Sequence, residues 1–221
     1  MLYKCEVSGI EAMARNHHTR DGDWKSRRRN DHFAHQAKAA GYRSRAAWKL
    51  IEINDKDRLI NRGSVVIDLG AAPGSWSQVA LKEVGATGRV IAVDRLPIEP
   101  LDNLEIIEGD FTKADIQAAV KDAAQNKPID LVLSDMAPNI SGVRDFDQAR
   151  SIELATAARN FALEHLCPGG RLVLKLFEGS ETVGFKRDTR KLFEACAVRK
   201  PSSSRPESTE FFLVARRSNV A

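Results

Sequence analysis

The stretch that most constrains the fold of this 221-residue chain lies at positions 64–76 and reads SVVIDLGAAPGSW. Its β-branched run, residues 65–67, is typical of a buried parallel strand. An acid follows this run, and two glycines then bracket a turn into a helical pattern: Asp68, Gly70, Gly74 and Trp76. Glycines at such a turn let the backbone pass close to a ligand. The stretch therefore predicts the first strand of an open α/β sheet, with a ligand pocket at its carboxyl end.

The turn differs from the usual phosphate-binding loops. No Gly-Lys-Ser/Thr follows it, which excludes a P-loop, and it lacks the Gly-x-Gly-x-x-Gly pattern of dinucleotide sites. A strand, an acid and a Gly-x-x-x-Gly turn without a phosphate-binding lysine suit a cofactor that carries a nucleoside but no phosphate. We therefore predict S-adenosylmethionine as the cofactor. An ordinary strand-to-helix turn is the alternative.

From Ser64 onward, strand patterns alternate with helical patterns, which is typical of a doubly wound and mostly parallel sheet. We expect strands at 64–69, 89–94, 104–109, 129–135, 171–177, 195–199 and 210–216. Helices are expected at 114–126 and 147–166, and Pro168-Gly169-Gly170 is expected to end the second helix and turn the chain into the fifth strand. No helical pattern separates the last two strands. They are therefore expected to pair antiparallel at the edge of a seven-stranded sheet.

Positive charge is concentrated near the N-terminus. Residues 1–49 hold 11 Lys and Arg against 5 Asp and Glu, whereas the whole chain has a net charge of only +4. A basic segment beside a nearly neutral domain predicts contact with a polyanion, and a solvated tail is the alternative for the first thirty residues. We expect 1–30 to be an N-terminal extension and 31–221 to form one domain. The candidate phosphate contacts are Lys25, Arg27, Arg28, Arg29, Lys38, Arg43, Arg45 and Lys49.

Several classes of protein are disfavoured by composition. The three cysteines, Cys5, Cys167 and Cys196, are far apart and odd in number, which argues against a disulfide scaffold and for a reducing compartment. No apolar run approaches membrane-spanning length, and the N-terminus lacks the apolar core of a signal peptide. None of the five histidines sits in a pattern with zinc spacing. We therefore expect a cytoplasmic protein without a membrane segment or a metal.

Acidic residues recur where four successive predicted strands end, at Asp68, Asp94, Asp110 and Asp135. Ligands of such sheets bind beyond the carboxyl ends of the strands. Asp94 stands 20 residues after Gly74, the usual place for an acid that accepts hydrogen bonds from ribose hydroxyls. Asp110 could face an adenine in the same pocket. Capping of the helix that follows is the alternative role for each.

Lys175 stands inside the apolar run 172–177, which is expected to be buried. An unpaired buried ammonium is costly, so this lysine must be paired, extended toward water or functional. Desolvation lowers the pKa of a lysine, whereas a neighbouring carboxylate raises it. A lysine in which these effects balance near neutrality can serve as a general base.

Six ordered blocks between about Asp31 and Ala215 make the chain similar to the FtsJ/RrmJ family of ribose 2′-O-methyltransferases. They are GYRSRAAWKL at 41–50, DLGAAPGSWSQ at 68–78, GDF at 109–111, SDMAPN at 134–139, LKLF at 174–177 and RKP at 199–201. The resemblance implies a Rossmann-like class I methyltransferase fold dependent on S-adenosylmethionine. It also implies a catalytic set at Lys49, Asp135, Lys175 and Glu210. The implied cofactor contacts are Gly74, Trp76, Asp94, Asp110 and Asp135, to which the glycine turn adds Gly70.

The resemblance further implies a reaction: transfer of a methyl group to the ribose 2′-hydroxyl of a uridine in the A-loop of 23S rRNA. Because the basic groups form a segment beside the pocket without a separate RNA-binding domain, we expect the assembled large ribosomal subunit as substrate. We also expect a monomer. The same chemistry on tRNA or an mRNA cap is the nearest alternative. A non-catalytic RNA-binding module would leave the four catalytic positions unexplained, and a dinucleotide-dependent oxidoreductase would lack its glycine turn. One departure is Phe212, which stands where the family commonly has an aromatic hydroxyl.

Overall fold

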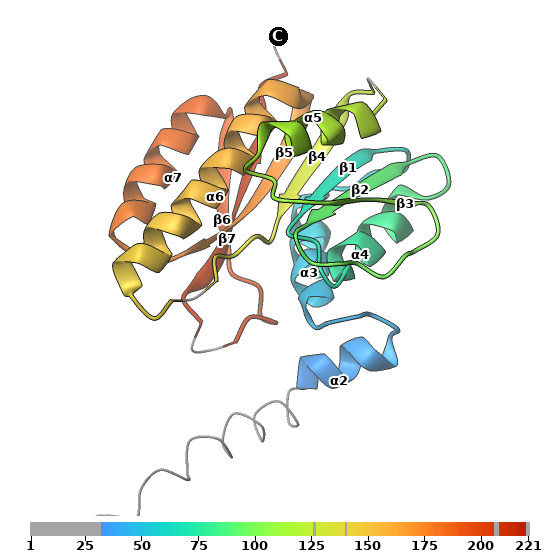
Figure 1. Ribbon diagram of the computed structural model, residues 1–221, viewed down its shortest axis with the longest axis horizontal. Coiled ribbons are helices and arrows are strands. Elements are labelled where there is room, and N and C mark those ends of the chain that lie inside the picture. Colours follow the sequence, from blue (N-terminus) through green and yellow to red (C-terminus); the bar gives the residue numbers. More distant parts are fainter. Residues whose placement is uncertain (1–31, 126, 140, 206–207, 220–221) are drawn as a thin grey trace, which may run out of the picture.

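A computed structural model describes residues 32–125, 127–139, 141–205 and 208–219 (Figure 1). The expected extension at 1–30, with Lys25 and the arginines at 27–29, lies outside the described residues. The strands are β1 (Val65–Leu69), β2 (Arg89–Asp94), β3 (Leu104–Glu108), β4 (Ile129–Ser134), β5 (Leu166–Phe177), β6 (Ala195–Arg199) and β7 (Glu210–Arg216). The helices are α2 (His32–Ala39), α3 (Ala46–Asp57), α4 (Ser75–Val84), α5 (Ala114–Ala123), α6 (Arg144–His165) and α7 (Ser180–Leu192).

The seven strands form one sheet in the order β3-β2-β1-β4-β5-β7-β6. All neighbours pair in parallel except β7, which is antiparallel to both β5 and β6. The predicted mostly parallel seven-stranded sheet with an antiparallel pair at its edge is therefore confirmed. The structure adds that β7 lies between β5 and β6. As a result, Glu210 is paired with Phe177, two positions along β5 from Lys175.

The prediction for the start of the fifth strand was wrong. Helix α6 ends at His165 and β5 begins at once at Leu166, so the Pro-Gly-Gly sequence lies inside the strand. Leu166 pairs with Ile129, and the register between β4 and β5 then shifts. An irregularity of this kind can accommodate proline, which lacks the N–H for a regular ladder of hydrogen bonds, and glycine within a strand.

Two helices were not expected from the sequence. The buried residues of α7 are Thr182, Phe185 and Thr189, which have helical spacing although two of them are polar. The Thr182 hydroxyl donates to the carbonyl of Phe177 at 2.7 Å, and the Thr189 hydroxyl donates to the carbonyl of Phe185 at 2.8 Å. Helix α2 buries only one alanine. Neither helix carries an apolar stripe, which is the signal that predicts a helix from sequence.

Helices cover both faces of the sheet (Figure 1). Apolar residues of α5, α6 and α7 form one core with β1 side chains such as Val65 and Ile67. Helices α3 and α4 form a second core on the opposite face, which includes Val66. Because strand side chains alternate between faces, Asp68 points toward α3 and α4. Among the described residues, no helix is long and apolar enough to cross a membrane.

Candidate active site

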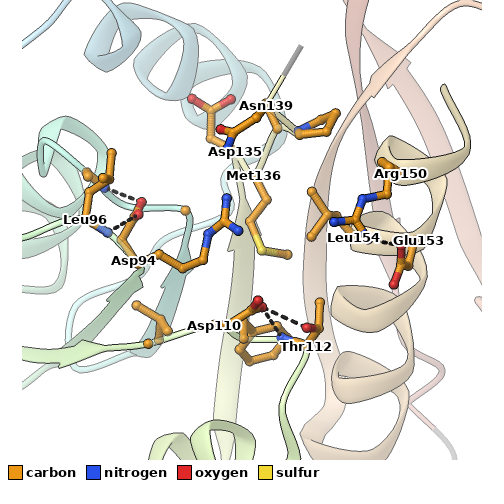
Figure 2. Close-up of a pocket in the computed structure, with 18 of the residues that line it drawn as sticks. Asp94, Leu96, Asp110, Thr112, Asp135, Met136, Asn139, Arg150, Glu153 and Leu154 are labelled. Atoms are coloured by element: carbon orange, nitrogen blue, oxygen red, sulfur yellow. Dashed lines mark hydrogen bonds and ion pairs between the residues drawn. The ribbon is translucent and has the colours of Figure 1, made fainter. Parts of the chain in front are cut away.

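The carboxyl ends of β1 to β4 open into a cavity of about 650 Å³ (Figure 2). Four of the residues predicted to contact a cofactor line it: Gly70, Asp94, Asp110 and Asp135. The loop after β4 contributes Met136, and α6 contributes Arg150 and Leu154 on the opposite wall. The cavity therefore lies where ligands of doubly wound sheets bind.

Gly70 is needed because two chain segments meet at the floor of this cavity. It has φ of 75°, and a Cβ at this position would lie 2.8 Å from both the nitrogen and the Cα of Met136. A side chain would therefore collide with the backbone that leaves β4. Glycine avoids that collision and also adopts the left-handed conformation without strain.

Asp94 and Asp110 hold the two loops that border the cavity. Asp94 accepts hydrogen bonds from the backbone N–H groups of Ala72 and Leu96, both at 2.9 Å. Asp110 accepts from the backbone N–H of Thr112 at 3.0 Å and from its hydroxyl at 2.7 Å. The bonds from Thr112 lower the pKa of Asp110. Both carboxylates are thus oriented by the chain, and each retains capacity to accept from a ligand.

Gly74 and Trp76 do not line the cavity. The Trp76 indole is only 2% exposed, and its N–H donates to the carbonyl of Ala46 at 2.8 Å. Its ring packs against Phe212, with 5.6 Å between ring centroids. The side chain of Trp76 therefore joins α4 to α3 and β7. A direct cofactor contact by this residue would have to come from its backbone, which lies in the first turn of α4 close to the glycine turn.

Two arginines predicted to hold phosphates make main-chain contacts instead of standing clear of the protein. The Arg43 guanidinium donates to the carbonyls of Pro73 and Pro100, at 2.8 and 3.2 Å. It thus joins the glycine turn to the loop after β2. Arg45 donates to the carbonyl of Ser203. Contact of either arginine with RNA stays a prediction, but both have a structural role beside the site.

The four residues predicted to be catalytic form two ion pairs. Lys175 Nζ lies 3.1 Å from Asp135 Oδ1, and Lys49 Nζ lies 2.5 Å from Glu210 Oε1. All four side chains are less than a fifth exposed. They come from α3, β5, β7 and the end of β4, and residues 49 and 210 are brought together only by the fold. Because Asp135 also lines the cavity, the Lys175–Asp135 pair stands at its edge, and the charge of Lys175 also acts on Glu210 of the other pair.

The charges of these pairs support one another. Burial acts to raise the pKa of Glu210, but the hydrogen bond and charge of Lys49, a hydrogen bond from Ser204 and the charge of Lys175 together hold that pKa below its usual value. Glu210 is therefore a carboxylate near neutral pH. It gives Lys49 a fixed anionic partner in an environment from which water is largely excluded.

Comparison with known proteins identifies the architecture. The sequence profile described as FtsJ-like methyltransferase matches residues 42–218. The chain belongs to the FtsJ-like methyltransferase family. A crystal structure described as that of a ribosomal RNA methyltransferase from Plasmodium falciparum superposes on this family member with a TM-score of 0.70 at 30% identity, covering 80% of this chain and 98% of that one.

Two relatives are similar to this FtsJ-like methyltransferase over most of its length. The chain is 48% identical over 191 residues to ribosomal RNA large subunit methyltransferase E of Azoarcus sp. (strain BH72), covering 86% of this chain and 93% of the relative. It is 49% identical over 193 residues to the protein of the same name from Alkalilimnicola ehrlichii, covering 87% and 92%. The predicted family and fold are thereby confirmed.

Sequence reasoning missed two residues of this FtsJ-like methyltransferase that contact the Lys49–Glu210 region. Glu52 accepts hydrogen bonds from the backbone of Ser202 and Ser203, and the Ser204 hydroxyl lies 2.9 Å from Glu210 Oε1. Spacing along α3 could have placed Glu52 on the face of Lys49. Its partners, however, are 150 residues away in sequence, and no local pattern indicates them.

Proposed function

We propose that this protein transfers a methyl group from S-adenosylmethionine to the ribose 2′-hydroxyl of a uridine in the A-loop of 23S rRNA, with the assembled large ribosomal subunit as its substrate. The observation that carries the proposal is the presence of two buried lysine–carboxylate pairs, one of which borders the cavity through Asp135. Relatives at 48–49% identity carry the name ribosomal RNA large subunit methyltransferase E, which supports the same substrate class here.

The residues of the cavity fit S-adenosylmethionine. Asp94 would accept from the ribose hydroxyls and Asp110 from the adenine, while Gly70 lets the β1 turn pack against the Met136 backbone at the cavity floor. A cavity of about 650 Å³ is in the range of cofactor sites. When bound, this cofactor supplies a methyl group on a sulfonium, which is an electrophile that needs no metal or phosphate.

The protein must then align a weak nucleophile and remove its proton. A ribose 2′-hydroxyl held in line with the methyl group forms the new oxygen–carbon bond as the sulfur–carbon bond breaks, and such positioning can supply much of the rate. Lys175 would take the proton released by the hydroxyl as a neutral amine, after its own ammonium proton has passed to solvent, with Asp135 orienting the amine. Lys49 and Glu210 would hold the ribose and tune Lys175. The four titratable groups lie close together, so their protonation is coupled and an observed pKa describes the group as a whole.

The discriminating experiment offers three RNAs to the purified protein at one salt concentration: large ribosomal subunits lacking the modification, free rRNA and tRNA. We expect methylation of the large subunit at a single ribose, located by mapping 2′-O-methyl positions. Preferential methylation of tRNA would replace the substrate while leaving the chemistry intact. If the protein binds these RNAs but transfers a methyl group to none of them, the non-catalytic alternative is supported and the proposal is overturned.

We also propose that residues 31–221 form one methyltransferase domain that acts as a cytoplasmic monomer. The single seven-stranded sheet, with its flanking helices on both faces, supports the domain boundary.

Neutralising the basic residues at 27–29 should weaken RNA binding and flatten its salt dependence while leaving cofactor affinity unchanged. These positions lie outside the described residues, so the prediction rests on charge alone.

A further inference from the structure

We propose that Ser204 and Glu52 are positioning residues for the Lys49–Glu210 pair. The inference rests on the proposed function, because it assumes that this pair takes part in methyl transfer. Neither residue lines the cavity among the residues described. Glu52 contacts the segment between β6 and β7, here called the 200–205 loop, and Ser204 belongs to this loop.

One face of α3 holds this loop. Arg45, Lys49 and Glu52 follow at spacings of four and three residues, so they project from the same side of the helix. The Glu52 carboxylate accepts from the backbone N–H groups of Ser202 at 2.7 Å and Ser203 at 3.0 Å. Burial acts to raise the pKa of Glu52, but these serine hydrogen bonds leave it lowered. The helix that carries the catalytic lysine thus also grips the loop.

The loop in turn holds the catalytic carboxylate. Ser204 is 7% exposed, and its hydroxyl lies 2.9 Å from Glu210 Oε1, the same oxygen that lies 2.5 Å from Lys49 Nζ. Glu210 itself is 7% exposed, so few orientations are open to it. A donor from the loop and a donor from α3 therefore converge on one oxygen. Loss of either would leave the carboxylate free to rotate and less able to hold Lys49.

A second link joins α3 to the hairpin formed by β6 and β7, and it provides a control. Asp57, at the end of α3, accepts from Arg199 Nε at 2.7 Å and Nη2 at 2.5 Å. It stands eight residues, or about 12 Å along the helix, from Lys49. This ion pair ties helix to hairpin without contact with Glu210. A purely structural effect of loosening α3 from the hairpin should therefore appear in Asp57→Asn as well.

The test compares Ser204→Ala, Ser204→Thr, Glu52→Ala and Asp57→Asn in the full chain, using large subunits lacking the modification. We expect kcat to fall about tenfold in Ser204→Ala and Glu52→Ala while KM for cofactor and for subunits is unchanged. Ser204→Thr, which keeps the hydroxyl, should recover most of the rate. Asp57→Asn should lower the melting temperature and leave kcat near that of the parent.

The pH profile provides a readout that instability would not move. Without the Ser204 hydrogen bond, the pKa of Glu210 rises, so the rate deficit of Ser204→Ala should widen as the pH decreases. A parent-like kcat in Ser204→Ala, or equal losses in Ser204→Ala and Asp57→Asn, would overturn the inference. Full activity in Glu210→Gln would instead show that the Lys49–Glu210 pair is not needed for methyl transfer. That result would count against the proposed function, whereas the two results above count only against the inference.

Discussion

Asp68 offers the sharpest test of how burial controls charge in this protein. Its side chain is fully buried at 0% exposure, and one carboxylate oxygen accepts from the Ser77 hydroxyl at 2.6 Å. The other oxygen has no hydrogen-bond partner among the described residues. Burial raises the pKa of Asp68 to about 7, with Ser77 opposing the rise and the charges of Asp135 and Asp94 adding to it. We predict that the free energy of unfolding of the parent decreases as the pH increases because of Asp68. The variant Asp68→Asn should not show this decrease.

The sign and size follow from proton linkage. The unfolded carboxyl titrates near 3.8 and the folded one at about 7, so the native state binds more protons between these values. Stability therefore decreases with increasing pH by about 1.4 kcal/mol per pH unit across this window. The loss between pH 5 and pH 8 is about 3 kcal/mol, because the slope vanishes above the folded pKa. The asparagine variant has no carboxyl at this position and should not show it.

Urea unfolding of both proteins at several pH values between 5 and 8 measures the effect. The free energy of unfolding of Asp68→Asn, relative to the parent, should increase by about 3 kcal/mol from pH 5 to pH 8, while other titrating groups cancel in the difference. Asp102→Asn, which removes an exposed carboxylate, is the matched control and should show no such trend. Parallel pH profiles for parent and Asp68→Asn would refute the reasoning, whatever their absolute offset.

Three further predictions concern the site. Lys175→Ala should bind S-adenosylmethionine nearly as the parent does in calorimetry but lose most of its methyl transfer, and substantial activity near neutral pH would exclude the lysine as proton acceptor. Asp94→Ala should weaken cofactor binding by about 1–3 kcal/mol, because the ribose hydroxyls and the Ala72 N–H lose their acceptor; unchanged affinity by calorimetry would reject the ribose contact. Arg43→Gln should also weaken cofactor binding, because the glycine turn and the loop after β2 lose their shared donor; a change confined to the salt dependence of RNA binding would favour a phosphate contact instead.

Local features of the sequence were sufficient to predict the sheet. The β-branched runs, the glycine turn at 70–74 and the acids at strand ends act within a few residues of one another, and such short-range patterns survive without knowledge of the fold. They placed Gly70, Asp94, Asp110 and Asp135 at one edge, and all four line the cavity. Local reasoning failed where burial is carried by threonines, as in α7, or where a strand continues through proline and glycine, as in β5.

Only the tertiary structure decided which distant side chains meet. The insertion of β7 between β5 and β6 brings Glu210 beside Lys175, and packing of α3 on the sheet brings Lys49 to Glu210. The inward turn of Trp76 and the main-chain contacts of Arg43 depend in the same way on segments far along the chain. Such contacts follow from strand order and from the demand that buried polar groups find partners. Strand order and the partners of buried polar groups are properties of the folded chain, so local sequence patterns do not reveal them.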